Sequence, residues 1–297
     1  MPPAHDSASI SDVQRAITAW FADTSRDLPW RSRETTPWGV LVSEVMLQQT
    51  PAARVVGPWT AWMSRWPAAG DVAAASAADV LRQWDRLGYP RRALRLQQTA
   101  RVVVAEHAGV VPDEEAALLA LPGIGSYTAA AVMAFAYRRR SLVLDVNIRR
   151  VLARIDGGVA HPSRHETAKE RTRAWHWVPA SDGEAADWSA AAMELGATIC
   201  TARSPLCHSC PVARQCRWVL NGRPSWEGPE RVGQSWDGTN RQCRGRIMAA
   251  LRAAPSGVTL TDIVWGDGAQ LARCADSLVA DGLAELTDTG LVLPTAS

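Results

Sequence analysis

Apolar residues recur three and four positions apart along most of the first 220 residues, which is the spacing of one face of an α-helix. The pattern predicts helices over 12–22, 52–66, 77–88, 93–108 and 114–121, and a further helix within 144–155 that "DGG" at 156–158 ends. No alternating strand pattern is found before residue 280. We therefore predict a mostly α-helical protein.

The end of the chain has a different pattern. Residues 221–240 are rich in glycine, proline and polar side chains without periodicity, which predicts a linker. Three helices are then predicted at 244–254, 259–264 and 268–282, with two short strands around a turn within 283–293. This order is typical of a winged helix, a relative of the helix-turn-helix readers of DNA.

The third helix of this unit carries acidic groups where a DNA-reading helix is usually basic. Asp276 and Asp281 stand there against Arg273, and the phosphates of DNA repel acidic side chains. We therefore favour a packing or protein-contact module over a direct DNA reader.

Composition and charge set broad limits. The chain has 297 residues, 47% of them hydrophobic, which is enough for one large domain or two. No long apolar run indicates a membrane span, and the start of the sequence lacks a signal-peptide pattern, so we expect a cytoplasmic protein with no membrane partner. The net charge of +2 does not indicate nucleic acid. Residues 137–154, however, hold six arginines against one aspartate, which suits either phosphate binding or a solvated helix face.

Four of the six cysteines, Cys200, Cys207, Cys210 and Cys216, fall within 17 residues in the spacing C-x6-C-x2-C-x5-C. In a cytoplasmic chain such a cluster indicates a metal site rather than disulfides. Zinc and a [4Fe–4S] cluster both use four thiolates. Only one C-x2-C pair is present and the spacing is uneven, which favours iron–sulfur.

A glycine-containing turn joins two of the helical patterns in "LPGIGSYTAAAVMAFA", residues 121–136. Gly123 and Gly125 allow the backbone to approach another molecule closely. The helix that opens at Ser126 offers free N–H groups to an anion such as phosphate. A plain helix–helix turn would explain the motif equally well.

Two carboxylic acids stand in contrasting surroundings. On a helix, Glu44 shares its face with Val40, Leu41 and Leu47, and such surroundings favour the protonated form. Asp145 stands where a helix begins, and the N–H groups there favour the ionised form. One neutral and one charged acid is the division of labour that glycoside cleavage needs. Taken alone, Glu44 could be a hydrogen-bonded core acid and Asp145 a helix cap.

The cysteine spacing, the hairpin and an aspartate about 20 residues after it together resemble the endonuclease III superfamily of helix-hairpin-helix DNA glycosylases. "LPWR" (28–31), "SEVMLQQT" (43–50), "LGYPRRALRL" (87–96) and Tyr127 are similar to the MutY-type adenine DNA glycosylases of that superfamily. The resemblance covers roughly residues 10–220.

The resemblance implies the helix-hairpin-helix glycosylase fold. A six-helix barrel would occupy about 30–140, and the N-terminal segment with 141–220 would form an iron–sulfur cluster domain, so the catalytic domain is 1–220. The linker 221–240 and a small winged-helix-like domain, 241–297, would follow it. Many relatives carry a larger β-rich C-terminal domain, for which this last segment is too short.

The resemblance further implies a monofunctional glycosylase of base excision repair that removes adenine mispaired with 8-oxoguanine or guanine. Glu44 would protonate the adenine as general acid, and Asp145 would stabilise the oxocarbenium-like sugar, with Asn147 in support. Tyr127 also supports the site and stands where the lyase members of the superfamily have a lysine, so water would be the nucleophile. The one lysine of the chain is Lys169.

The remaining site residues are also assigned by the resemblance. Trp30 and Arg31 would line the adenine pocket, and Gln49 and Tyr89 would insert into the duplex beside the oxidised guanine. The hairpin residues and the loop arginines would contact the DNA backbone: Gly123, Gly125, Ser126, Arg203, Arg214 and Arg217. The ligands of a [4Fe–4S] cluster would be the four cysteines, Cys200, Cys207, Cys210 and Cys216.

The expected partner is double-stranded DNA with a mispair, bound by a monomer, while the C-terminal unit could recruit a protein. Relatives often have Gln or Glu where this chain has Ala190, so one contact to adenine is expected to be missing. Two other functions stay open: a thymine–guanine mismatch glycosylase and a non-catalytic iron–sulfur protein that binds DNA.

Overall fold

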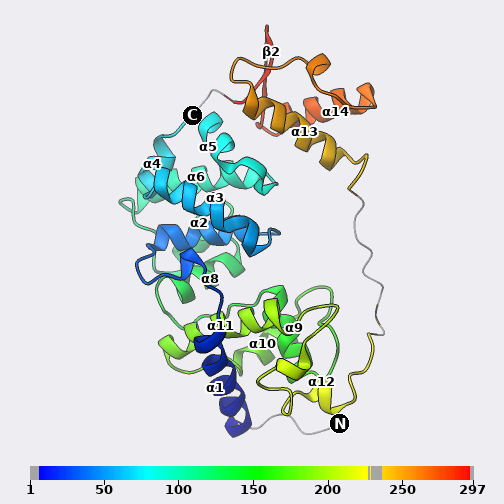
Figure 1. Cartoon of the computed structure of the whole chain (residues 1–297). Coiled ribbons are helices and arrows are strands. Elements are labelled where there is room, and N and C mark those ends of the chain that lie inside the picture. The colour runs from blue at the N-terminus through cyan, green and yellow to red at the C-terminus, as the bar shows by residue number, and fades with distance from the viewer. Residues whose placement is uncertain (1–6, 227, 229–235, 295–297) are drawn as a thin grey trace. The chain divides into compact units, whose positions relative to one another are not determined.

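The computed structural model describes residues 7–226, 228 and 236–294, and part of the predicted linker 221–240 lies outside this range (Figure 1). The chain forms two compact units. Unit 1 comprises Met1–Arg31, Asp113–Glu115 and Gly125–Glu230, and unit 2 comprises Ser32–Pro112, Ala116–Ile124 and Arg231–Ser297. Among the described helices, none is both long and apolar enough to cross a membrane.

Unit 1 is built around one central helix, α11 (Asp182–Thr198), against which the other long helices pack. These are α1 (Ser7–Thr24), α8 (Ser126–Phe135) and α9 (Val146–Ile155), and Figure 1 shows α1 and α9 beside α11. The unit also contains η1 (Pro29–Arg31), α10 (Ala168–Trp175), η3 (Cys207–Ser209) and α12 (Arg217–Leu220). The rings of Trp177 and Trp188 stack in its core with centroids 6.0 Å apart.

The sequence pattern did not predict α11, although its composition suits a helix. The segment is rich in alanine, the best helix former, and Asp182 and Glu184 in its first turn complement the helix dipole. Buried residues occur all around the helix, so it lacks the polar face that gives an amphipathic helix its period. A helix that is buried on most of its sides is the kind that periodicity alone misses.

The larger part of unit 2 consists of short helices packed on α6 (Arg91–Glu106). Three rings, Trp62, Trp66 and Trp84, meet edge to face at its centre, with Trp62 at 4.8 Å from Trp66 and 5.8 Å from Trp84. The other elements are α2 (Pro37–Leu47), α3 (Ala52–Arg65), α4 (Ala69–Ala74), α5 (Ala77–Trp84), η2 (Asp85–Leu87) and α7 (Glu115–Ala120). The helices that the sequence predicted in this region are therefore present.

The C-terminal part of unit 2 has the predicted order of helices and strands. It contains α13 (Asn240–Ala253), η4 (Leu260–Asp262), α14 (Gly268–Ala280) and an antiparallel pair, β1 (Glu285–Thr287) and β2 (Gly290–Val292). The second predicted helix is only a 3-10 turn. Val258 bridges to Leu291 and extends the strand pair. Cys243 and Cys274, far apart in sequence, are both buried in α13 and α14, two helices that pack against each other.

Candidate active site and metal centre

Glu44 lies in the middle of a buried helix. Thr36 caps α2 by accepting a hydrogen bond from the backbone N–H of Gly39 at 3.2 Å, and Pro37 opens the helix. Residues Trp38–Met46 are all buried, so α2 runs through the core of unit 2. Glu44 is 5% exposed, which confirms the buried position that its apolar neighbours predicted.

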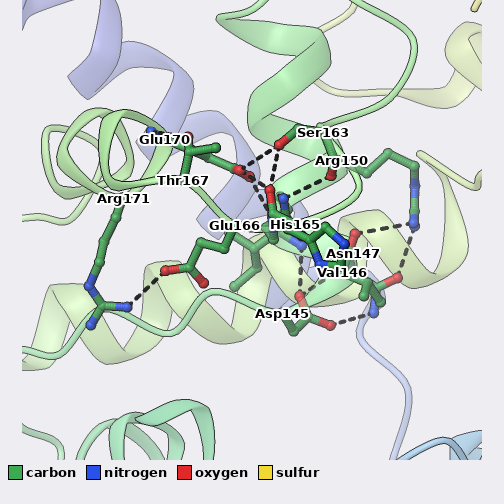
Figure 2. A network of polar contacts seen from close by, with 12 residues as sticks. Asp145, Val146, Asn147, Arg150, Ser163, His165, Glu166, Thr167, Glu170 and Arg171 are labelled. Atoms are coloured by element: carbon green, nitrogen blue, oxygen red, sulfur yellow. Dashed lines mark hydrogen bonds and ion pairs between the residues drawn. The ribbon is translucent and has the colours of Figure 1, made fainter. Parts of the chain in front are cut away.

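Asp145 is the N-cap of α9, as predicted, and its carboxylate accepts three hydrogen bonds (Figure 2). Oδ1 accepts from the backbone N–H of Asn147 at 2.9 Å and of Ile148 at 2.7 Å. Oδ2 accepts from Nδ2 of Asn147 at 2.7 Å. The amide oxygen of Asn147 in turn accepts from Nη2 of Arg150 at 2.9 Å. The carboxylate is thus held in one orientation by the first turn of the helix it caps.

Two opposing effects act on the pKa of Asp145. Burial raises the pKa of its carboxyl above the ordinary value, although the hydrogen bonds from Ile148 and Asn147 and the charge of Arg150 act in the opposite direction. The hydrogen bonds at the helix start favour the ionised form, as the sequence predicted. Desolvation outweighs them, so the pKa is above its ordinary value.

Two arginines of α9 connect this helix to the cysteine segment. Arg150 donates from Nε to the Cys200 carbonyl at 2.7 Å and from Nη2 to the Gly196 carbonyl at 2.6 Å. Arg154, 2% exposed, donates to the Sγ of Cys200 at 3.2 Å and to the Thr201 carbonyl at 2.7 Å. Asp145, Asn147, Arg150 and Cys200 therefore form one continuous chain of contacts. The sequence did not indicate these roles of the two arginines, because their four-residue spacing also suits a solvated face.

The four predicted cysteines come together around one small apolar cavity. Cys200, Cys207, Cys210 and Cys216 line it with Leu195, Ile199, Pro205 and Trp218, and none of them is in a disulfide. Over the part of the chain that the structure describes, no three His, Cys, Asp or Glu side chains gather closely enough for a single metal ion. Four thiols spread around a shared cavity instead fit a multi-iron cluster.

Burial also changes the chemistry of these thiols. It raises the pKa of Cys210 to about 12 and that of Cys216 above its ordinary value, and the neighbouring thiols add to the effect in both cases. The positive charge of bound iron would favour the thiolate forms of Cys210 and Cys216 that a cluster needs.

The arginine-rich segment 137–154 is occupied mainly by contacts within the protein. Arg138 pairs with Asp187 at 2.6 Å, and Arg149 pairs with Glu170 at 2.6 Å. Arg150 and Arg154 are buried, as described above. In the cluster segment, Arg217 donates to the Asp156 carbonyl at 2.8 Å and is turned into the protein, whereas Arg203 and Arg214 are exposed. Those two remain predicted contacts of the DNA backbone.

The "LPWR" motif forms η1, in which Trp30 is 8% exposed and Arg31 is held by a buried acid. Glu194 of α11, 1% exposed, accepts from Nη2 of Arg31 at 2.8 Å and from Nε of Arg26 at 2.6 Å. These partners lower the pKa of Glu194 to about 2 despite its burial. Glu194 was not predicted from sequence, although it stands among apolar residues in "AAMELG" just as Glu44 does in α2.

The hairpin between α7 and α8 exposes its backbone. Gly123 has φ +77°, a conformation that favours glycine, and Gly123, Gly125 and Ser126 are all exposed. Gly125 is the N-cap of α8 and offers no side-chain cap, so the first N–H groups of the helix can meet an anion. Tyr127 follows in α8, half-buried against the core of unit 1.

Gln49 and Tyr89, the predicted wedge residues, share an unusual backbone. Gln49 has φ 56° and Tyr89 has φ 48°, both in the left-handed region, and both side chains are exposed. Such a conformation costs a residue with a side chain about 1–2 kcal/mol. Strained positions of this kind concentrate at functional sites.

Comparison with known proteins identifies the family. Residues 42–176 match the HhH-GPD superfamily base excision DNA repair proteins, and residues 200–216 match the iron-sulfur binding domain of endonuclease III. The chain is 48% identical over 284 residues to the adenine DNA glycosylase of Mycobacterium tuberculosis, covering 95% of this chain and 92% of that protein. The adenine DNA glycosylase of Mycolicibacterium smegmatis is also 48% identical, with 95% of each chain covered. The human enzyme is 40% identical over 71% of this chain and 40% of its own length.

Solved structures agree with the fold. A thermostable thymine-DNA glycosylase matches with a TM-score of 0.65 at 26% identity, covering 73% of this chain and all of its own. Endonuclease III in a non-covalent DNA complex matches with a TM-score of 0.62 at 20% identity, over 73% of this chain and 98% of that one. The cysteine segment carries the [4Fe–4S] cofactor that the spacing favoured. With the helical fold and the mycobacterial relatives, these matches establish that the chain belongs to the adenine DNA glycosylases of the helix-hairpin-helix base excision repair superfamily.

Proposed function

We propose that this protein removes adenine paired with 8-oxoguanine or guanine by hydrolysing the bond between the base and its sugar. The observation that carries the proposal is the Asp145 carboxylate, fixed by three hydrogen bonds at the start of α9. A half-buried carboxylate held in a fixed orientation stabilises a nearby cation because its dipoles and charge are already in place when the cation forms. An oxocarbenium-like sugar is such a cation.

Glu44 is the proposed general acid. Cleavage leaves negative charge on the adenine ring, and a proton delivered to a ring nitrogen neutralises that charge. A carboxylic acid among apolar side chains holds its proton more readily than one in water. The 5% exposure of Glu44 supports this role.

Water is the proposed nucleophile. A lyase forms a Schiff base through an amine, whereas Tyr127 presents a phenol at the corresponding place in α8. Lys169, the one lysine of the chain, lies exposed in α10. The expected product is an abasic site in an intact strand.

Recognition requires that the adenine leave the base stack, since its sugar bond cannot be reached inside the duplex. We propose that Gln49 and Tyr89 fill the resulting gap, which offsets an unstacking cost of a few kcal/mol. Trp30 and Arg31 would line the adenine pocket. The hairpin of Gly123, Gly125 and Ser126 would hold a phosphate.

The iron–sulfur centre would be held by the thiolates of Cys200, Cys207, Cys210 and Cys216. When bound, the cluster supplies covalent crosslinks that fix the shape of this segment. The fixed segment in turn orders Arg203 and Arg214, the two exposed arginines that are proposed to contact the DNA backbone.

A duplex panel tests the proposed function. Adenine or thymine is placed opposite 8-oxoguanine or guanine, and base release is measured in single turnover. We expect adenine release, fastest opposite 8-oxoguanine. The likeness to a thymine-DNA glycosylase structure makes the thymine arm necessary, and release of thymine without adenine would overturn the proposal.

A second test addresses Glu44 itself. Glu44→Gln keeps the shape of the side chain but cannot deliver a proton from a carboxyl group. We expect it to bind the duplex and to excise adenine about 10²- to 10⁴-fold more slowly. Excision at the rate of the unchanged chain would remove Glu44 from the mechanism.

A further inference from the structure

Arg92, in the first turn of α6, holds two separate loops of unit 2 with one guanidinium group. Nη1 donates to three carbonyls where α2 ends, those of Val45 at 2.8 Å, Met46 at 3.0 Å and Gln48 at 2.6 Å. Helix C-termini leave such carbonyls without partners, and a cation there is favourable. Arg92 therefore closes the end of α2.

The other nitrogen of the same group reaches the second loop. Nη2 donates to the carbonyls of Leu87 at 3.3 Å and Gly88 at 3.0 Å, and to Oγ1 of Thr50 at 3.2 Å. None of these six acceptors is a carboxylate. Burial without an acidic partner lowers the pKa of Arg92 to about 10. Arg92 therefore acts here as a hydrogen-bond donor and not as a member of an ion pair.

The positions of two of the acceptors are informative. The Gln48 carbonyl belongs to the peptide bond that enters Gln49, and the Gly88 carbonyl belongs to the peptide bond that enters Tyr89. Fixing these two peptide planes restrains the left-handed φ of both following residues, 56° and 48°. The guanidinium also lies over the Tyr89 ring, 5.5 Å from its centroid, and over the Trp84 ring at 5.2 Å.

We propose that Arg92 is a positioning residue that holds Gln49 and Tyr89 as a preset pair, and thereby determines how the enzyme responds to the base opposite the adenine. The inference rests on the proposed function, in which these two side chains enter the duplex. Because one guanidinium group donates hydrogen bonds to both loops, it keeps the distance between the Gln49 and Tyr89 side chains constant. Lysine, with a single nitrogen, cannot span both sets of carbonyls.

The test is a double-mutant cycle built on Arg92→Lys. Its rate of adenine release opposite 8-oxoguanine and opposite guanine is compared with that of the unchanged chain, and the comparison is repeated in a Gln49→Ala/Tyr89→Ala background. We expect Arg92→Lys to slow release opposite 8-oxoguanine about 10-fold or more in the first background and less than about 3-fold in the second, since residues that act together are not additive. Preference for 8-oxoguanine over guanine should shrink in the same proportion.

Arg91→Lys is the matched control. Arg91 is its neighbour in α6, is exposed, and pairs with Asp281 rather than with either loop. It should leave the rates and the preference unchanged. Thermal unfolding and iron content establish that each variant is folded. Should Arg92→Lys fail to fold, Thr50→Val replaces it in the cycle, because it removes the hydroxyl acceptor that lies between the two loops.

The outcomes distinguish a failure of the inference about Arg92 from a failure of the proposed function. An equal cost of Arg92→Lys in both backgrounds would show that Arg92 only supports the fold, and would overturn the inference. If Gln49→Ala/Tyr89→Ala itself changed neither rate nor preference, there would be no pair for Arg92 to position, and the inference would fail as well. An unchanged chain that released no adenine would instead refute the proposed function.

Discussion

Replacing Arg154 by methionine should loosen the cysteine segment and release its iron. The Arg154 guanidinium donates to the Ala160 carbonyl at 2.9 Å, to the Thr201 carbonyl at 2.7 Å and to the Ala202 carbonyl at 3.2 Å. It also donates to Sγ of Cys200 and lies over the Trp218 ring at 4.7 Å. Methionine keeps much of the apolar volume and removes every donor.

The expected loss of stability depends on which carbonyls can accept a hydrogen bond from water once the Arg154 donors are gone. Ala202 is exposed and regains a partner from solvent, whereas Ala160 is buried and Thr201 is half-buried. A buried acceptor left without a donor costs about 1–3 kcal/mol, so we expect roughly 2–4 kcal/mol for the segment. If the segment must open before iron leaves, iron release should be about 30- to 1000-fold faster.

The assay is the rate of iron release to a chelator at pH 7, with iron content per chain measured beforehand. Arg203→Ala is the control, because Arg203 lies in the same segment and is exposed; its iron should leave at the rate of the unchanged chain. If Arg154→Met keeps its iron as long as the unchanged chain does, then the hydrogen bonds of Arg154 do not stabilise the cluster segment and the reasoning is wrong.

Three further predictions concern single groups. Asn147→Leu removes a hydrogen bond to the ionised carboxylate of Asp145, so the pKa of Asp145 should rise further and the acid limb of the pH–rate profile should move to higher pH; an unmoved limb would exclude Asp145 as its origin. Glu194→Gln should lower the free energy of unfolding at pH 7 by about 2 kcal/mol, measured with urea. The lowering of the Glu194 pKa from 4.5 to about 2 corresponds to about 3 kcal/mol. We discount this figure because Arg26, one of its two partners, is 42% exposed. This stabilisation is present above the unfolded pKa near 4.5 and is lost as pH falls toward 2, so equal stability of the two proteins at pH 7 would count against it. Because Tyr127 stands where a lyase has its lysine, we expect borohydride to trap no protein–DNA adduct during normal turnover. A trapped adduct would indicate an amine nucleophile.

Residues with a strong local pattern were predicted well from sequence. The four cysteines come together because close spacing leaves a short segment few ways to separate them. Glu44 is buried and Asp145 caps a helix, because helical periodicity and capping chemistry are both local properties. The same is true of the hairpin at Gly123 and Gly125.

The properties that the sequence did not predict depend on distant parts of the chain. The pKa of Asp145 depends on how much water the fold removes, which its own helix does not determine. Arginines such as Arg150 look like solvated helix residues until the loop that they bind is in place. The role of Arg92 could not be predicted for the same reason, since its hydrogen-bond acceptors lie up to 47 residues away in sequence.

The single lysine of this chain gives the protein a practical property. Lys169 is exposed in α10, so an amine-reactive dye should mark one side chain besides the α-amino group, without the thiol reagents that would attack the cluster ligands. Glu170, the next residue in sequence, is paired with Arg149 of α9, the helix that Asp145 caps. A fluorophore at this position would report movements of that helix as DNA binds, in the natural sequence and without any engineered attachment point.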